Sequence, residues 1–351
     1  MANLFEILND RFRCLYRFLC IAIIVLTSIS SVQAETVLRL SNWVPPSHTV
    51  TRDILTPWME DVARVTEGRV TIDALKTPLG KPPAHFDIAR DGMADIAIGV
   101  HGYTPGRFVL SQIAELPFLS DSSEVLSVAY WRVHEAYLAK AGEHDGVHLL
   151  GLWTHGPGHI FNGRREITSL DKLDGLKFRV GGGLVSQIAE ALGTVAVPAP
   201  ATKSYELLSN RVADGIYFPV ESIVFFKLAG LMRYGTLVPG GLYNSSFFLV
   251  VNERSWQAID AADRAAIMSV SGEHLARRAG RAWDQADSMG MQTLTGAGVS
   301  MSVMSSGSIT ELKHRLAFAE RNWVAQASER GISAAVAVAA LRAEIAANNL
   351  R

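Results

Sequence analysis

The chain contains 351 residues, of which 48% are hydrophobic and 19% are charged. With 33 basic and 34 acidic residues its formal net charge is −1, so the sequence offers no basic face and nucleic acid is excluded as an expected partner. The length is sufficient for two domains, each with its own apolar core.

The first 34 residues have the features of a cleavable signal peptide. A basic region precedes an apolar run at residues 18–29, and the small side chains of Val32 and Ala34 predict cleavage before Glu35. The apolar run is shorter than the roughly 20 residues that a spanning helix needs. We therefore expect export to the periplasm, with an uncleaved amphipathic anchor as the alternative.

Both cysteines, Cys14 and Cys20, lie within this predicted signal peptide. The mature chain therefore has no cysteine for a disulfide, a nucleophile or a thiolate metal site. We expect an ordinary apolar core to hold it together.

Short apolar runs alternate with amphipathic stretches along the mature chain, a pattern typical of parallel strands joined by crossover helices. The predicted strands are 37–40, 69–75, 94–99, 148–153, 177–180, 195–198 and 214–218. The predicted helices are 49–66, 122–141, 184–192 and 202–210. A last apolar run, 247–251, is expected to form a strand buried on both faces.

No proline follows Pro239, and the pattern predicts nearly continuous helix over residues 256–294. At 1.5 Å per residue such a helix would be about 55 Å long, longer than a small domain is wide. We expect one curved helix that crosses both domains. Two shorter helices, broken near Gly272 or Gly280, are the alternative.

The sequence lacks the common signatures of enzymes. It has no G-x-S-x-G nucleophile elbow and no G-x-x-x-x-G-K phosphate loop. The segment from His134 begins like a zinc-protease helix, but Leu138 takes the place of the second histidine. His155 and His159 have a ligand-like separation, yet the glycine and proline residues between them prevent a shared helical face. We predict no catalytic residue, no metal site and no cofactor.

Arg179 lies at the end of the predicted strand 177–180, just before three glycines at 181–183. In an open α/β sheet, ligands bind beyond the carboxyl ends of the strands. An arginine there can present a rigid fork of donors to a carboxylate, and free amides at the following helix N-terminus favour an anion. A surface arginine and a tight glycine turn are the plain alternatives.

At this point the sequence resembles a known family, the DctP-like periplasmic solute receptors of tripartite ATP-independent periplasmic (TRAP) transporters. The segment LDKLDGLKFRV at 170–180 is similar to their D-L-K-G-L-K-I-R-V stretch. Further matches occur in order at 66–70, 91–96, 107–108, 115–119, 196–200, 205–208, 212–215 with Pro219, and 247–252. The resemblance covers nearly the whole mature chain.

The resemblance implies an α/β, two-lobed periplasmic-binding-protein fold (type II-like), with a hinged cleft and a long helix that spans both lobes. We expect lobe I to comprise residues 35–157 and 246–285, and lobe II to comprise 158–245 and 286–351. Members of the family carry no catalysis: closure of the cleft traps a small-molecule carboxylate. The implied partners are the small and large integral membrane subunits of the transporter.

By similarity, Arg179 takes the position of the arginine that pairs with the substrate carboxylate. Trp43 and His48 lie in the loop after the first strand, where the family often lines its cleft. Arg107 matches a second arginine of some members, with a surface role as the alternative. Asn244 aligns with an asparagine that can reach the ligand.

Two departures from the family pattern bear on the ligand. Many members have an additional arginine where this chain has Gly158 beside His159, and many have D-G-x-E-N-P where this chain has Tyr217 and Phe218. A polyhydroxylated acid would leave its hydroxyl groups unpaired in such a site. We therefore predict a small monocarboxylate with an apolar or aromatic body, stacked among Trp43, Tyr217 and Phe218.

Several alternatives stay open from the sequence. A C4-dicarboxylate could bind through Arg107 and His159, and a sugar acid could bind to the same fold. A periplasmic enzyme could use His155, His159 or Glu221 for acid–base chemistry. A sensor subunit that docks on a signalling receptor could also share this fold.

Overall fold

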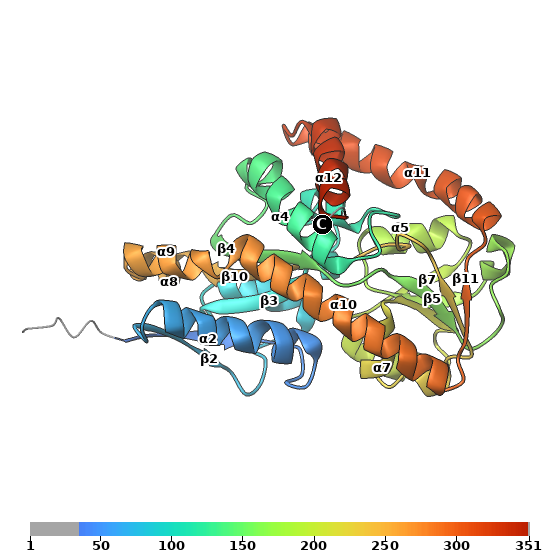
Figure 1. Cartoon of the computed structure of the whole chain (residues 1–351), viewed down its shortest axis with the longest axis horizontal. Coiled ribbons are helices and arrows are strands. Elements are labelled where there is room, and N and C mark those ends of the chain that lie inside the picture. Colours follow the sequence, from blue (N-terminus) through green and yellow to red (C-terminus); the bar gives the residue numbers. More distant parts are fainter. Residues whose placement is uncertain (1–34, 350–351) are drawn as a thin grey trace, which may run out of the picture. The chain divides into compact units, whose positions relative to one another are not determined.

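Two β-sheets carry the described part of the chain, residues 35–349, in this computed structural model (Figure 1). The predicted signal peptide at residues 1–34 lies outside the described residues, so that prediction stays a prediction. No described helix is long and apolar enough to cross a membrane.

The first sheet has five strands in the order β2-β1-β3-β10-β4. These strands are β1 (Thr36–Ser41), β2 (Val70–Ala74), β3 (Ile96–Val100), β4 (Val147–Thr154) and β10 (Ser246–Asn252). Its main helices are α2 (Thr56–Val65), α3 (His85–Arg90) and α4 (Ser123–Val133). Every residue of β10 is buried, which confirms the prediction of a strand buried on both faces.

The second sheet has six strands in the order β11-β9-β5-β8-β6-β7. These strands are β5 (His159–Asn162), β6 (Lys177–Val180), β7 (Val195–Pro198), β8 (Gly215–Phe218), β9 (Tyr234–Leu237) and β11 (Ser300–Val303). The helices α5 (Leu184–Ala191), α6 (Ser204–Ser209) and α7 (Val220–Phe225) connect or follow its strands.

The chain passes between the sheets three times. One passage is the helical stretch 253–296, from β10 to β11. The other two are short segments, which we call the crossing segments: residues 155–158, from β4 to β5, and residues 238–245, from β9 to β10. They are hydrogen-bonded to each other, because Gly158 N donates to Tyr243 O (2.9 Å) and Leu242 N donates to Gly158 O (2.9 Å). β5 and β10 run antiparallel to their neighbours. This corrects the expectation of parallel strands: no crossover helix returns the chain before β5 or β10.

The long helix is shorter than predicted. Residues 253–296 form three helices, α8 (Glu253–Ala258), α9 (Ala261–Ser269) and α10 (Gly272–Gly296), so the prediction of one continuous helix is wrong and the break near Gly272 is confirmed. The side chain of Asp260 caps α9 by accepting from Ala262 N (2.8 Å), which favours a new helix start over continuation.

α10 nevertheless spans both lobes, packing on α4 and β4 at one end and on α7 at the other (Figure 1). Its 25 residues are about 38 Å long at 1.5 Å per residue. Gly280 does not break the helix. A methyl group at Gly280 would lie 2.2 Å from Glu124 Cα, so this glycine lets α10 and α4 approach closely.

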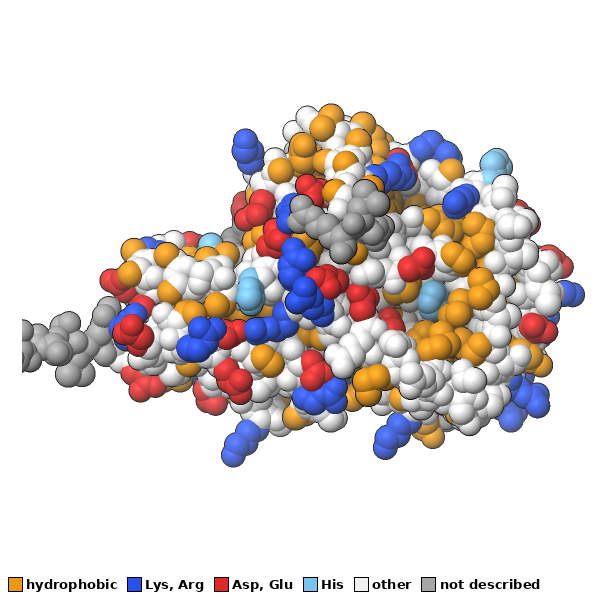
Figure 2. Space-filling view, in the orientation of Figure 1, with side chains coloured by type: hydrophobic (Ala, Val, Ile, Leu, Met, Phe, Trp, Pro, Cys, Tyr) orange, Lys and Arg blue, Asp and Glu red, His pale blue; other side chains and the backbone are white. Residues whose placement is uncertain are grey.

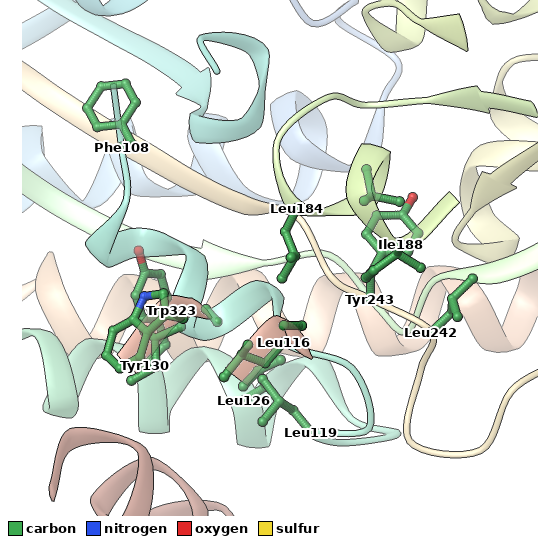
Figure 3. Close-up of a cluster of buried hydrophobic side chains, with 14 of the residues drawn as sticks. Phe108, Leu116, Leu119, Leu126, Tyr130, Leu184, Ile188, Leu242, Tyr243 and Trp323 are labelled. Carbon is green, nitrogen blue, oxygen red and sulfur yellow. The ribbon is translucent and has the colours of Figure 1, made fainter. Parts of the chain in front are cut away.

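The C-terminal helices α11 (Ser306–Glu329) and α12 (Ala334–Asn349) return to the first lobe. α12 packs on α4, although we expected residues 286–351 to belong to lobe II. Trp323 of α11 donates its indole N–H to Val109 O (3.0 Å) and shares a core cluster with Tyr130 of α4 (Figure 3). The same cluster includes Leu184 of α5, so it joins elements of both lobes.

Charged side chains of both signs are interspersed on the face that carries α10 (Figure 2). Arg277 of α10 pairs with Glu273 (2.9 Å) and with Glu124 of α4 (3.2 Å). Glu273 also pairs with Arg132 (2.9 Å). This network holds the first half of α10 against α4, with each exposed pair contributing about 1 kcal/mol or less.

Candidate functional site

A cavity of about 40 Å³ lies where the two sheets meet. Most of the residues that line it are apolar or aromatic, as is typical of small-molecule sites. The first lobe contributes Trp43, Val44, His48, Val50, Val100 and Tyr103; the second lobe contributes Arg179, Gly181, Ala201, Phe218, Ser222 and Phe226. The crossing segments and β10 contribute His155, Tyr243, Ser245 and Phe247, and α10 contributes Trp283.

Apart from histidines, Arg179 is the only acidic or basic residue among the described residues that line this cavity. It lies at the carboxyl end of β6 and is 1% exposed. Its Nε and Nη2 atoms donate to Ala199 O, Nε at 2.9 Å. Within residues 35–349, no carboxylate pairs with the guanidinium and no acceptor binds Nη1. A buried cation without a counter-ion is unfavourable, so the cavity is built to receive an anion.

Aromatic rings surround this cation. The guanidinium carbon of Arg179 lies 4.8 Å from the centre of the Phe218 ring, a cation–π contact. Phe218 stacks on Phe226, with ring centres 5.8 Å apart. From the first lobe, Trp43 lies 5.7 Å from Tyr103, ring centre to ring centre. A flat apolar body fits among such faces, since aromatic pairs favour offset or tilted contacts over this range.

His155 of the first crossing segment is a neutral ring with both nitrogens occupied. Its Nδ1 contacts Gly156 O, and its Nε2 accepts from Ser245 N (3.0 Å). Burial, with a smaller contribution from Arg179, lowers the pKa of His155 to about 4. The ring therefore fixes the crossing segments and adds no charge to the cavity near neutral pH.

His48 faces Glu221 across the lobes at 3.7 Å between Nε2 and Oε1. The Nδ1 atom of His48 accepts from Val50 N (3.1 Å), which places the ring proton on Nε2. Burial lowers the pKa of His48 to about 3 and raises the pKa of Glu221 to about 7. With a neutral histidine this contact is a long polar contact rather than an ion pair.

The lobes touch directly beside the cavity. Tyr103 of the first lobe accepts a hydrogen bond at its hydroxyl from Ala201 N of the second lobe (3.0 Å). The turn at Gly102 meets the glycines that follow β6. The cleft is therefore closed in this structure.

Four of the residues predicted from the sequence meet in this cavity: Arg179, Trp43, His48 and Phe218. They come from both lobes and are separated by up to 175 residues in the chain, as residues 43 and 218 show. The fold brings them together at the carboxyl ends of β1, β6 and β8.

The other four predicted residues do not line the cavity. Tyr217 lies in the lobe core, stacked on Phe178 at 4.5 Å between ring centres. His159 is buried in β5 and accepts from Val238 N (3.1 Å) through Nδ1. Neither side chain is free to stack on a ligand in the closed cleft.

Arg107 and Asn244 also have structural partners. Arg107 pairs with Asp87 (2.7 Å) and lies over the Phe86 ring. Asn244 Nδ2 donates to His155 O (2.9 Å), which joins the two crossing segments. The second cation that a dicarboxylate would need is therefore absent from the described wall of the cavity.

Sequence reasoning missed several members of the wall, chiefly Tyr103, Phe226, Tyr243 and Trp283. Trp283 lies on α10, after the last of the other lining residues along the chain, Phe247. A large aromatic residue on the buried face of a predicted helix was the available signal, but it does not distinguish a core position from a cavity. Among the described residues, no cluster of three or more potential ligands could hold a metal ion.

The two sheets form two lobes, which the crossing segments join. A closed cavity that carries a buried cation lies between the lobes. These features define a two-lobed solute-binding protein. Residues 40–323 match the family described as "Bacterial extracellular solute-binding protein, family 7", also designated DctP. The chain belongs to this family, which confirms the resemblance to TRAP solute receptors and the expected fold class.

Individual relatives agree with this assignment. A protein of Comamonas testosteroni described as the outer membrane transporter protein TsaT is 32% identical over 334 residues, covering 95% of this chain and 98% of that protein. A TRAP periplasmic solute-binding protein of Bordetella bronchiseptica, solved with (R)- and (S)-mandelate, is 40% identical with a TM-score of 0.87. That match covers 90% of this chain and 100% of the relative.

A second solved relative, from Rhodoferax ferrireducens, holds copurified benzoate and is 28% identical with a TM-score of 0.83. The match covers 90% of this chain and 98% of the relative. A marine metagenome protein described as specific for aromatic acids was solved with metahydroxyphenylacetate. It is 30% identical with a TM-score of 0.82, and the match covers 89% of this chain and 99% of the relative.

Proposed function

We propose that this protein is the periplasmic receptor of a TRAP transporter and that it captures a small aromatic monocarboxylate. The observation that carries the proposal is Arg179, a cation 1% exposed and without a counter-ion, in the wall of a closed cavity. A ligand carboxylate supplies the missing charge, and charge-assisted hydrogen bonds to a guanidinium both attract and orient it.

The number of charges in the wall supports a single carboxylate. His48 and His155 are neutral near pH 7 because burial lowers their pKa values to about 3 and about 4. Arg179 is then the only cation that the described residues present to the ligand. A second ligand carboxylate would be buried without a partner, which is strongly unfavourable. The dicarboxylate alternative is therefore not favoured.

The apolar remainder of the wall supports an aromatic body. Trp43, Phe218 and Phe226 offer ring faces, and the polar groups of His155 and Tyr243 are already bound to backbone. A sugar acid would bring several hydroxyl groups to a wall with few free partners. The ligands of the relatives, mandelate, benzoate and metahydroxyphenylacetate, are aromatic acids and agree with this inference.

Ligand capture then works by a shift between open and closed lobes. A ligand that contacts both lobes adds binding energy only in the closed form and so raises its population. The closed receptor would dock on the small and large membrane subunits and release the acid there. The predicted signal peptide supports a periplasmic location, where such a receptor meets its ligand.

The test is a binding survey on residues 35–351, unfolded and refolded to remove carried-over ligand. Benzoate, mandelate and 3-hydroxyphenylacetate are compared with succinate and gluconate by thermal shift and calorimetry. A ligand at 100 times its Kd adds about 2.7 kcal/mol to stability, a shift of several degrees for a chain of this size. We expect shifts with aromatic acids only.

Two results would contradict the proposal. Succinate or gluconate binding more tightly than every aromatic acid would reject the ligand class. Chemical conversion of a bound acid, followed by chromatography over hours, would favour the enzyme alternative. The sensor alternative differs in its membrane partner, which co-purification with the permease subunits distinguishes.

A further inference from the structure

Glu221 lies in the partition between the ligand cavity and a groove on the surface. Its neighbours Ser222 and His48 line the cavity. Glu221 itself lines the groove, together with residues of the segment 47–53 from the first lobe and residues of α10. The contact between Glu221 and His48 is therefore one of those that separate the closed cavity from the outside.

Both lobes bury the carboxyl group of Glu221. The residue belongs to α7 of the second lobe and is 5% exposed. Within that lobe, its Oε2 accepts from Ser222 Oγ (2.8 Å). From the first lobe, His48 Nε2 lies 3.7 Å from its Oε1, and the side chain of Thr49 contributes a further hydrogen bond. Opening of the cleft would separate Glu221 from His48 and Thr49 and admit water to the carboxyl group.

The charges around this carboxyl group do not compensate its ionised form in the closed cleft. The titratable and charged groups that face it are His48, Arg52 and Asp53 of the first lobe and Asp287 of α10. Burial keeps His48 neutral, with a pKa of about 3. Arg52 is exposed and bound to Asp53 (2.7 Å between Nε and Oδ1), while Asp53 and Asp287 repel a negative charge on Glu221. Ionised Glu221 is thus less favourable in the closed cleft than in the open one, where water solvates it.

We infer that Glu221 takes up a proton when the cleft closes on a ligand, so that capture of the aromatic acid is coupled to proton binding. This inference rests on the proposed function, because ligand capture is the event that closes the lobes. Burial raises the pKa of Glu221 to about 7 in the closed form, and we expect it to return toward its ordinary value of 4.5 in the open form. Since the closed form binds the proton more tightly, this contribution to ligand affinity is present at low pH and is lost as the pH rises through 7.

His48 titrates in the opposite sense. Burial lowers its pKa from the ordinary value of 6.5 to about 3, so a His48 ring that is protonated in the open form loses its proton on closure. The net proton uptake of the wild-type protein therefore combines the two residues. A variant that lacks only the Glu221 carboxyl group isolates the proposed contribution, because His48 titrates in both proteins.

The experiment measures the number of protons taken up per bound ligand, by calorimetry at pH 7 in buffers of different ionisation enthalpy. The probe is whichever of benzoate, mandelate and 3-hydroxyphenylacetate binds the wild-type protein most tightly, since all three acids are ionised at this pH. We expect Glu221→Gln to take up about half a proton fewer than wild type, because a group with a pKa of about 7 is half protonated at pH 7. The affinity of wild type relative to Glu221→Gln should also rise about tenfold from pH 8 to pH 6.

Asp284→Asn is the matched control. Removal from water also raises the pKa of Asp284, but the groups that donate to its carboxylate, Ser122 Oγ, Ser123 N and Glu124 N, all lie in the first lobe. Opening of the cleft leaves these contacts in place. This variant should therefore keep the proton uptake of wild type.

The possible failures are distinguishable. Equal proton uptake by wild type and Glu221→Gln, with the acid still bound, would reject the inference alone. The same deficit in Asp284→Asn as in Glu221→Gln would also reject it, because the effect would then not belong to Glu221. If Glu221→Gln does not fold, Glu221→Met gives the same comparison, since it too carries no titratable group. No binding of any of the three acids by wild type would reject the proposed function, and the inference with it.

Discussion

Gly102 and Gly182 touch across the closed cleft: a methyl group at Gly182 would lie 2.5 Å from the carbonyl oxygen of Gly102. Gly102 belongs to the first lobe and Gly182 follows β6 in the second, two residues beyond Val180. The close approach of these two backbone segments is therefore one of the contacts that close the cleft beside the cavity.

Gly182→Ala should prevent full closure and weaken ligand binding by at least about tenfold, because the added methyl group cannot fit against Gly102. The residue also has a φ of +87°, so backbone strain of about 1 kcal/mol accompanies the substitution. Gly175→Ala is the control, since Gly175 has a φ of +75° but nothing within 4 Å of the added methyl group. Equal affinities of the two variants, measured by calorimetry, would exclude a role for this contact in closure.

Arg179→Met should have opposite effects on the empty and the ligand-bound protein. Without ligand, removing a buried cation that has no counter-ion should stabilise the fold by about 1–2 kcal/mol and raise the Tm by a few degrees. With ligand, losing the partner of the carboxylate should weaken binding about 100- to 1,000-fold.

Arg107→Ala is the matched comparison for Arg179→Met, because Arg107 pairs with Asp87 outside the cavity. We expect its ligand affinity to stay within about twofold of wild type. Loss of binding in Arg107→Ala would revive the dicarboxylate alternative, in which this arginine holds a second carboxylate.

Glu221→Gln should gain stability relative to wild type as the pH rises. Burial raises the pKa of Glu221 from its ordinary value of 4.5 to about 7. The folded state therefore binds the proton more tightly than the unfolded state, and wild-type stability falls as the pH rises from 4.5 to 7. Glutamine does not titrate, so the variant avoids this loss, which amounts to roughly 3 kcal/mol.

The measurement is the difference in unfolding free energy between Glu221→Gln and wild type, in urea, at pH 4.5 and pH 8. The buried histidines titrate in both proteins and cancel in this difference. A difference that does not change with pH would show that Glu221 ionises at its usual pKa.

Gly280→Ala should destabilise the protein by about 1–3 kcal/mol or more, because its methyl group would lie 2.2 Å from Glu124 Cα and force α10 away from α4. Alanine is otherwise the better helix former by about 1 kcal/mol. Gly296→Ala, at the end of the same helix with nothing within 4 Å of its methyl group, should be neutral or stabilising. Thermal unfolding of the two variants tests this contrast.

Much of the fold follows from the sequence, because the alternation of apolar strands and amphipathic helices specifies the parallel part of each sheet. The short strands β5, β9 and β11 were not predicted. Each has four residues, and β9 contains a glycine, so periodicity gives little signal. Their place in the sheet depends on pairing between distant segments, which local propensity does not encode.

Sequence reasoning identified the residue whose side-chain chemistry marks the site. It missed the residues whose place in the cavity depends on the three-dimensional fold. Tyr217 and Phe218 were predicted to stack on one ligand, yet they are consecutive residues of β8. Neighbouring side chains of a strand point to opposite faces, so Phe218 lines the cavity while Tyr217 packs on Phe178. This alternation was available in the sequence.

The crossing segments that connect the lobes also form part of the cavity wall, through His155, Tyr243 and Ser245. The pivot and the ligand contact are thus the same stretch of backbone. A bulkier acid would press on the pivot itself, so the size of the bound molecule would be translated into the angle between the lobes. In the receptor proposed above, a membrane partner would then meet a different lobe angle for each acid and could discriminate between acids without touching them.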